Sequence, residues 1–201
     1  MKIKLINYSP NPLKGLWLAA KVCYQKGDIG FLEEKFKEND AVLLLKKIYD
    51  KKHLSIFEQS FFQFDIDEVS RSLMAQLTRH RIGWSYAVQS QHYQKHMDFK
   101  FKDLEQYIDE DNKKEYYKLM GTINNFYKNA VESGMPRYIA REVLPNSCLV
   151  HIIASTNLRA LDHFWGLRKG VENTPEIRVL AENTYNEILN VMPELEKIIT
   201  Y

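Results

Sequence analysis

Hydrophobic residues recur along the chain at two spacings, and the shorter one predicts strands. Over residues 59–67 the period is two, with Phe62, Phe64 and Ile66 on one side and mainly polar residues on the other. Such alternation is typical of a strand that buries one face. The other stretches that favour an extended chain are residues 2–8, 148–155 and 84–93, and the last of these fits a loop equally well.

The longer spacing, three and four residues, predicts helices. They cover residues 13–25, a segment from a cap at Asn39 or Asp40 to Lys52, a segment capped by Ser70, residues 114–133, a short stretch ending near Pro145, and residues 158–168 and 176–191. The second of them should bury Val42, Leu43, Leu45 and Ile48. Residues 100–112 look irregular. Because no internal repeat or low-complexity segment interrupts the chain, we expect one α+β domain over residues 1–201.

The helix that begins after Ser70 carries a polar cluster. Gln76, Arg79 and His80 stand at i, i+3 and i+4, so a helix would hold them on one face. The run Arg79-His80-Arg81 is weak evidence by itself, since basic residues at a helix end commonly just complement the helix dipole. Its meaning depends on the surrounding sequence.

Composition and charge narrow the class of protein. The chain has 201 residues, of which 45% are hydrophobic and 27% charged, as in ordinary globular proteins. Lys and Arg number 28 against 26 Asp and Glu, so the whole molecule has no field that would hold a polyanion such as DNA. An anionic ligand must therefore be bound locally.

The cysteines and the N-terminal residues indicate the cellular compartment of the protein. Cys23 and Cys148 are far apart and form no CxxC motif, which suits a reducing compartment and predicts neither a disulfide framework nor a zinc site. The N-terminus has no long apolar region, and no stretch reaches the ~18 to 20 apolar residues of a membrane span. We expect a cytoplasmic protein.

Two common ligand motifs are missing. His92 and His96 stand at i, i+4, but Tyr93 follows His92 where a zinc hydrolase would have Glu, so no metal site is expected. Among eight glycines there is no Gly-x-Gly-x-x-Gly sequence, and a dinucleotide would therefore not bind at a Rossmann turn.

The residues around Arg79-His80-Arg81 resemble the signature region of flavin-dependent thymidylate synthases from residue 53 to residue 93. The matching positions are His53, Ser55, Phe57, Glu58, Ser70, Arg71, Gln76, Arg79, His80, Arg81 and Ser90. A second block is also similar to the family: residues 140–145 (AREVLP), 156–168 (TNLRALDHFWGLR) and 175–181 (PEIRVLA). Two ordered blocks over roughly half the chain argue against chance agreement.

The resemblance implies two ligands and the residues that bind them. FAD would be bound by His53, Ser55, Glu58, Arg79, His80, Arg81, Asn157, Arg159 and His163. The nucleotide dUMP would be bound by Gln76, Arg79, Gln89, Ser90, His92, Arg141 and Arg168. Several arginines suit this task, because guanidinium groups bind phosphate with paired hydrogen bonds.

The same resemblance implies a fold and a reaction. The fold would be an antiparallel sheet flanked by helices, in a homotetramer whose sites draw on more than one subunit. The reaction would methylate dUMP to dTMP with methylenetetrahydrofolate as one-carbon donor, while NADPH reduces the flavin. Arg168 is the first candidate for catalysis, because a guanidinium beside the uracil carbonyl can stabilise charge on the ring. Ser90 would position the nucleotide.

The chain departs from the family pattern at positions expected to face ligands. Val88 replaces a polar or acidic residue, and Gln91-His92 stands where the family usually has x-Arg. Glu172 and Asn173-Thr174 stand where the family commonly has a His and then Ala-Gln. These departures leave two alternatives open: a flavoprotein of the same fold that acts on another pyrimidine nucleotide, and a catalytically silent protein that binds nucleotides or nucleic acid.

Overall fold

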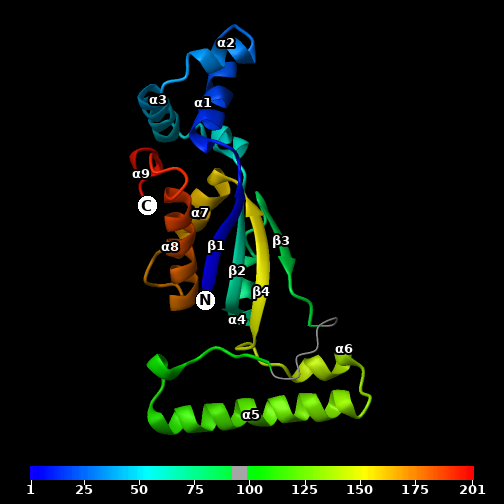
Figure 1. The fold of residues 1–201 in the computed structure, drawn as a ribbon. Helices are drawn as coiled ribbons and strands as arrows, with labels where there is room; N and C mark the ends of the chain where they lie inside the picture. The colour runs from blue at the N-terminus through cyan, green and yellow to red at the C-terminus, as the bar shows by residue number, and fades with distance from the viewer. Residues whose placement is uncertain (92–98) are drawn as a thin grey trace.

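The computed structural model describes residues 1–91 and 99–201, and its centre is an antiparallel sheet (Figure 1). The four strands lie in the order β1-β2-β4-β3, with bounds β1 Lys2–Tyr8, β2 Phe62–Ser70, β3 Trp84–Val88 and β4 Leu149–Thr156. Phe62 and Trp84 both pair with Thr156, from opposite sides of β4. The α+β class and the antiparallel sheet flanked by helices are confirmed.

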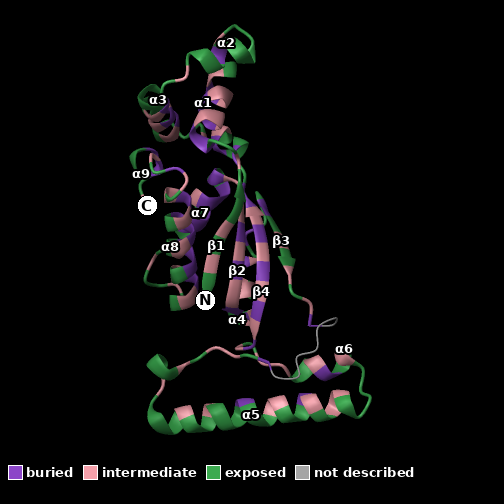
Figure 2. Cartoon of the chain, viewed as in Figure 1, coloured by how far each residue is buried: buried purple, intermediate pink, exposed green. Residues whose placement is uncertain are grey.

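The sheet has one buried face and one more polar face. Phe62, Phe64 and Ile66 of β2 are completely buried, whereas Gln63 and Asp65 between them are partly exposed. The period-two pattern of β2 is therefore confirmed. Helices α7 and α8 pack beside this sheet and supply much of the remaining core (Figures 1 and 2).

The chain forms nine α-helices and three short 3₁₀ helices within its described residues. The α-helices are α1 Pro12–Val22, α2 Ile29–Glu34, α3 Glu38–Asp50, α4 Arg71–Leu77, α5 Glu110–Glu132, α6 Arg137–Ala140, α7 Leu158–Arg168, α8 Pro175–Leu189 and α9 Leu195–Ile198. The 3₁₀ helices are η1 Leu54–Gln59, η2 Glu105–Tyr107 and η3 Arg141–Val143. None of the described helices combines the length and the apolar character that crossing a membrane requires.

Several sequence predictions are wrong in detail. Helix α3 begins at Glu38, so Asn39 and Asp40 lie in its first turn and do not cap it. Leu43 is 71% exposed instead of buried. Helix α5 begins four residues before the predicted start, because the side chain of Asp109 caps it by accepting from the Asn112 amide at 2.9 Å. The sequence pattern also missed α2 and α9, which are too short for a periodic signal.

Helices α5 and α6 with η3, residues 110–143, form an arm that lies across one end of the sheet, apart from the other helices (Figure 1). Met120 of the arm packs with Phe99 and Cys148, which lie outside it, in a separate small core. Only Met120 and Tyr127 of α5 are buried, and most of its surface is exposed or intermediate (Figure 2).

Candidate functional site

The position of the Arg79-His80-Arg81 run depends on how α4 ends. The predicted continuation of that helix through His80 is wrong: α4 ends at Leu77, and a turn follows. The Tyr86 hydroxyl lies 2.9 Å from the Leu77 carbonyl oxygen and 2.8 Å from the His80 carbonyl oxygen. Burial raises the pKa of Tyr86, so the hydroxyl keeps its proton and donates to these helix-end carbonyls. This tertiary contact lies at the point where the helix ends.

His80 points into the protein from this turn, while Arg79 and Arg81 are exposed. Its residue surface is 8% exposed, and its ring packs edge-on against Phe164 with 5.0 Å between centroids. The Arg168 Nε atom donates to His80 Nε2 at 2.9 Å. Burial first, and then the charges of Arg168 and His163, lower the pKa of His80 to about 4. His80 is therefore neutral at pH 7 and serves as an acceptor.

A cavity of about 470 Å³ opens beside this turn, and we call it the arginine cavity. Its lining residues are Arg79, His80, Arg81, Ile82, Trp84, His163, Leu167 and Arg168. Ile82 is 93% exposed, so the cavity combines an open apolar surface with three guanidinium groups. Such a combination suits an anionic ligand that also carries a flat ring.

A second cavity, of about 450 Å³, shares Ile82 and His163 with the first, and we call it the Asn157 cavity. Its lining residues are Leu54, Glu58, Ile82, Gly83, Asn157, Arg159, Ala160, Asp162 and His163. Asn157 caps α7 by accepting from the Ala160 amide at 2.9 Å, and Arg159 forms an ion pair with Glu58. The two cavities adjoin.

The close approach of two segments beside the Asn157 cavity requires a glycine. Gly83 has φ +74°, and a Cβ atom there would lie 2.8 Å from the Ala160 Cβ and 3.0 Å from the Asn157 amide nitrogen. A larger residue would push β3 away from the start of α7. Gly83 thus holds Ile82 over the junction of the two cavities.

These cavities fit the chemistry of FAD. The exposed side chains of Ile82 and Leu167 offer an apolar surface for a flat ring system. Arg81 and Arg159 provide donors that match phosphate oxygens. Two adjoining cavities also suit a long ligand with an isoalloxazine ring at one end and an adenosine at the other.

The structure brings together many of the predicted residues, but not all of them. Arg79, His80, Arg81, His163 and Arg168 line the arginine cavity, while Glu58, Asn157 and Arg159 line the Asn157 cavity with His163. His53 and Ser55 lie exposed at and near the start of η1, whose Leu54 lines the Asn157 cavity.

The remaining predicted nucleotide ligands lie outside the linings of both cavities. Gln76 is on α4, and its side-chain oxygen accepts from the Thr174 hydroxyl at 3.2 Å. Gln89 and Ser90 follow β3, and the Gln89 amide donates to the His151 carbonyl oxygen at 2.8 Å. Arg141 is on the arm, with its Nε 3.6 Å from Glu142.

His92 and His96 lie outside the described residues. In residues 1–91 and 99–201, no group of three or more His, Cys, Asp or Glu side chains is arranged to hold a metal ion.

Sequence reasoning placed Asn173 and Thr174 at ligand-facing positions but missed their contacts with other residues of the site. Asn173 Oδ1 accepts from Arg168 at 3.3 Å, and Thr174 contacts Gln76 as described above. The sequence feature that could have pointed to these contacts is that both positions differ from the usual family residues. Which atoms they contact depends on the turn between α7 and α8, and no periodic pattern predicts that turn.

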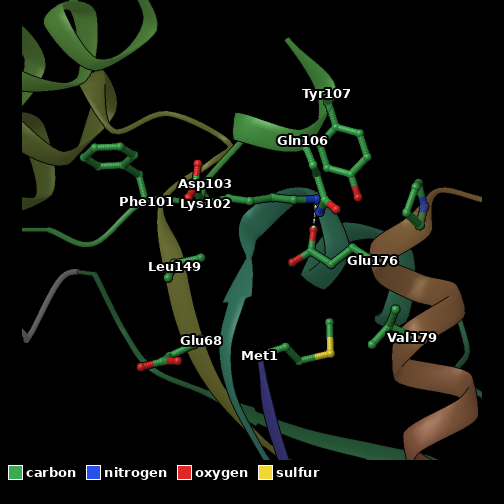
Figure 3. A pocket seen from close by; sticks show the side chains of 11 residues that line it. Met1, Glu68, Phe101, Lys102, Asp103, Gln106, Tyr107, Leu149, Glu176 and Val179 are labelled. Atoms are coloured by element: carbon green, nitrogen blue, oxygen red, sulfur yellow. Dashed lines mark hydrogen bonds and ion pairs between the residues drawn. The ribbon is translucent and has the colours of Figure 1, made fainter. Parts of the chain in front are cut away.

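A third cavity, of about 390 Å³, lies where the segment before the arm meets α8 (Figure 3). Lys102 and Glu176 face each other in it, with Nζ 2.7 Å from the carboxylate. The Glu176 carboxylate also accepts from the Ser70 amide at 2.8 Å and from the Ser70 hydroxyl at 2.7 Å. Because Ser70 caps α4, its hydrogen bonds to the Glu176 carboxylate help to fix the start of the helix that carries Gln76.

Two solved structures share this fold. One is the UMP/dUMP methylase PolB from Streptomyces cacaoi bound with 5-Br dUMP, with a TM-score of 0.83, 24% identity, and coverage of 98% of this chain and 93% of that chain. The other is thymidylate synthase X from Helicobacter pylori with FAD and dUMP, with a TM-score of 0.78, 18% identity and coverage of 100% of both chains. At these identities the likeness concerns the fold.

Sequence comparisons identify the family. The family model described as thymidylate synthase complementing protein matches residues 4–194. The flavin-dependent thymidylate synthase of Geobacter sulfurreducens is 34% identical over 201 residues, which cover 97% of this chain and 85% of the relative. That of Pyrococcus horikoshii is 36% identical over 209 residues, which cover 100% of this chain and 84% of the relative. The predicted resemblance is thereby confirmed: this chain belongs to the flavin-dependent thymidylate synthase family.

Proposed function

We propose that this protein methylates dUMP to dTMP, with FAD as cofactor, methylenetetrahydrofolate as one-carbon donor and NADPH as reductant. The observation that carries the proposal is the pair of adjoining cavities, in which the guanidinium groups of Arg79, Arg81 and Arg168 surround an open apolar surface in a member of this family. When bound, the flavin supplies a hydride and relays the one-carbon unit.

The residues of the Asn157 cavity would hold much of the FAD. Asn157 and Arg159 present donors at the start of α7, where the helix dipole also favours negative charge. Glu58 keeps Arg159 directed toward the cavity through their ion pair. His53 and Ser55, exposed at and near the start of η1, would close this site from the other side.

The nucleotide would share the arginine cavity with one end of the FAD. Arg168 reaches it from the end of α7, and its guanidinium would stabilise negative charge that develops on the uracil ring. Arg79 would bind phosphate, and Gln76, Gln89 and Ser90 would complete the contacts to the nucleotide. Ser90 would position the nucleotide for the reaction. His92 belongs to the same predicted set, although it lies outside the described residues.

A homotetramer would complete this site. Arg141, a predicted nucleotide ligand, is on the arm and does not line the arginine cavity. The arm also exposes large apolar side chains, among them Leu119, Phe126 and Ile139. A second copy that covers this surface would bury it and carry Arg141 toward a neighbouring cavity. We further propose that residues 1–201 fold as one domain and that the protein acts in the cytoplasm.

Spectroscopy and turnover test the proposal together. The purified protein should show the absorption bands of oxidised flavin, and NADPH should bleach them without oxygen. Addition of dUMP with methylenetetrahydrofolate should restore the bands and yield dTMP. A protein that binds no flavin under any loading condition would refute the proposal, as would a reduced flavin that dUMP and folate together leave unchanged.

The same assay with UMP tests a second candidate, methylation of another pyrimidine nucleotide. Val88 motivates it, because this residue stands where the family commonly has a polar or acidic side chain that could bind the ligands. Faster flavin reoxidation with UMP than with dUMP would select this candidate.

A further inference from the structure

The side-chain amide of Asn173 makes several hydrogen bonds across the turn between α7 and α8. Asn173 Nδ2 donates to the Leu167 carbonyl oxygen at 2.9 Å and to the Gly170 carbonyl oxygen at 3.3 Å. Leu167 is in the last turn of α7, where carbonyl groups have no partner within the helix. Asn173 therefore closes the end of the helix that carries Arg168.

The other end of the same amide faces Arg168. Asn173 Oδ1 accepts from the Arg168 NH1 group at 3.3 Å, while His80 Nε2 accepts from Nε at 2.9 Å. Two acceptors on different nitrogens fix the plane of the guanidinium, because its donors form a rigid fork. The free guanidinium edge is thereby directed before any ligand arrives.

The two acceptors, His80 and Asn173, are both neutral, so neither of them offsets the positive charge of Arg168. Glu172 accepts from the Asn173 amide at 3.1 Å, yet within residues 1–91 and 99–201 no carboxylate forms an ion pair with Arg168. Burial and the neighbouring charges lower the pKa of His80 to about 4, so it carries no charge at neutral pH. Arg168 thus keeps its full positive charge for an anionic ligand or for charge that develops during the reaction.

Thr174, the next residue, contacts a second predicted nucleotide ligand. Its hydroxyl donates to the Gln76 side-chain oxygen at 3.2 Å. That bond leaves the Gln76 amide NH₂ as the group available for donation. One short turn therefore orients side chains on both α4 and α7.

We propose that Asn173 is a positioning residue for Arg168, and that it orients the guanidinium for the nucleotide without neutralising its charge. The inference rests on the proposed function, in which Arg168 binds dUMP. Asn173 itself touches Arg168 and the turn; it acts on the nucleotide through Arg168.

A double-mutant cycle tests this inference, with dUMP affinity of the flavin-loaded protein measured by titration calorimetry at pH 7.5. Asn173→Ala should weaken dUMP binding about tenfold, the usual scale for losing a hydrogen bond to a charged group. In an Arg168→Ala background the same substitution should have no further effect, because its target is gone. Asn190→Ala, at an exposed position after α8, serves as the matched control and should bind dUMP normally.

A second variant separates orientation from charge. Asn173→Asp keeps an acceptor oxygen beside Arg168 but adds a carboxylate that would pair with the guanidinium. It should therefore bind dUMP at least as weakly as Asn173→Ala. Parent-like affinity in Asn173→Asp would refute the requirement for a neutral acceptor.

The outcomes distinguish this inference from the proposed function. If Arg168→Ala leaves dUMP affinity unchanged, Arg168 is not a nucleotide ligand, and the positioning role of Asn173 is wrong as well, while flavin reoxidation by dUMP and folate still tests the proposed function separately. If Arg168→Ala weakens binding but Asn173→Ala does not, only the positioning role is wrong. Equal losses from Asn173→Ala in both backgrounds would show that it acts through the turn and independently of Arg168, which also overturns the inference.

Discussion

His80 makes the stability of the protein depend on pH between its lowered pKa and the ordinary pKa of histidine. Its pKa is lowered from 6.5 to about 4, so between these values the unfolded chain binds a proton that the folded chain does not. Stability from this residue is therefore complete above pH 6.5, falls as the pH drops, and levels off below about 4. At pH 5 the two pKa values correspond to a loss of about 2 kcal/mol relative to pH 7.5.

The substitution His80→Gln isolates this contribution. Glutamine can accept from Arg168 but does not titrate, so the variant should lose about 2 kcal/mol less stability than the parent when the pH falls from 7.5 to 5. Carboxylates titrate in both proteins and cancel in the comparison. The assay is urea unfolding followed by circular dichroism at one protein concentration, because assembly affects apparent stability.

The comparison at pH 7.5 serves as the control, since it reports only the difference in packing between the two side chains. Parallel losses of stability in the parent and in His80→Gln would refute the reasoning. His80 would then be protonated in the folded protein at pH 5 and could not accept a hydrogen bond from Arg168 through that nitrogen at this pH.

Three further results are expected. Arg168→Lys should slow flavin oxidation by dUMP and folate by a factor of about 10² to 10³ in stopped-flow measurements, because lysine lacks the planar guanidinium; near-normal rates would leave Arg168 a structural role. Ser70→Ala removes the cap of α4 and should lower the free energy of unfolding by about 1 kcal/mol in urea titrations. Ser72→Ala, at an exposed position, should leave it unchanged, and equal effects of the two substitutions would contradict the capping role. Light scattering at micromolar concentration should give a mass above that of a monomer, and Phe126→Glu on the exposed surface of the arm should lower that mass. A monomer that retains activity would exclude active sites shared between subunits.

Some elements could be predicted because their signal is local. Strand β2 followed from alternating Phe62, Phe64 and Ile66, since a sheet with one buried face imposes period two. Helix α7 was predicted with its observed bounds, 158–168, because its apolar spacing continues throughout the segment. Family motifs then supplied the residues of both cavities, which no periodicity would have indicated.

Other features depend on contacts between distant residues and could not be predicted. The sequence between Ser70 and Arg81 continues a helical pattern, but the helix ends at Leu77, where the Tyr86 hydroxyl contacts the Leu77 and His80 carbonyl oxygens. The contact between Asn173 and Arg168 likewise requires the folded turn. Arg141 matches a family motif, yet a single chain leaves it on the arm, away from the arginine cavity.

The small number of buried residues in α5 should make this helix unfold locally more readily than the sheet. Of the α5 residues only Met120 and Tyr127 are buried, so unfolding this helix exposes far less apolar surface than unfolding the sheet. Amide protons of α5 in an isolated chain should therefore exchange with solvent at a lower free energy of opening than those of β2 and β4. A neighbouring subunit that covers Phe126 and Ile139 would raise that free energy, which links the protection of α5 amides directly to subunit association.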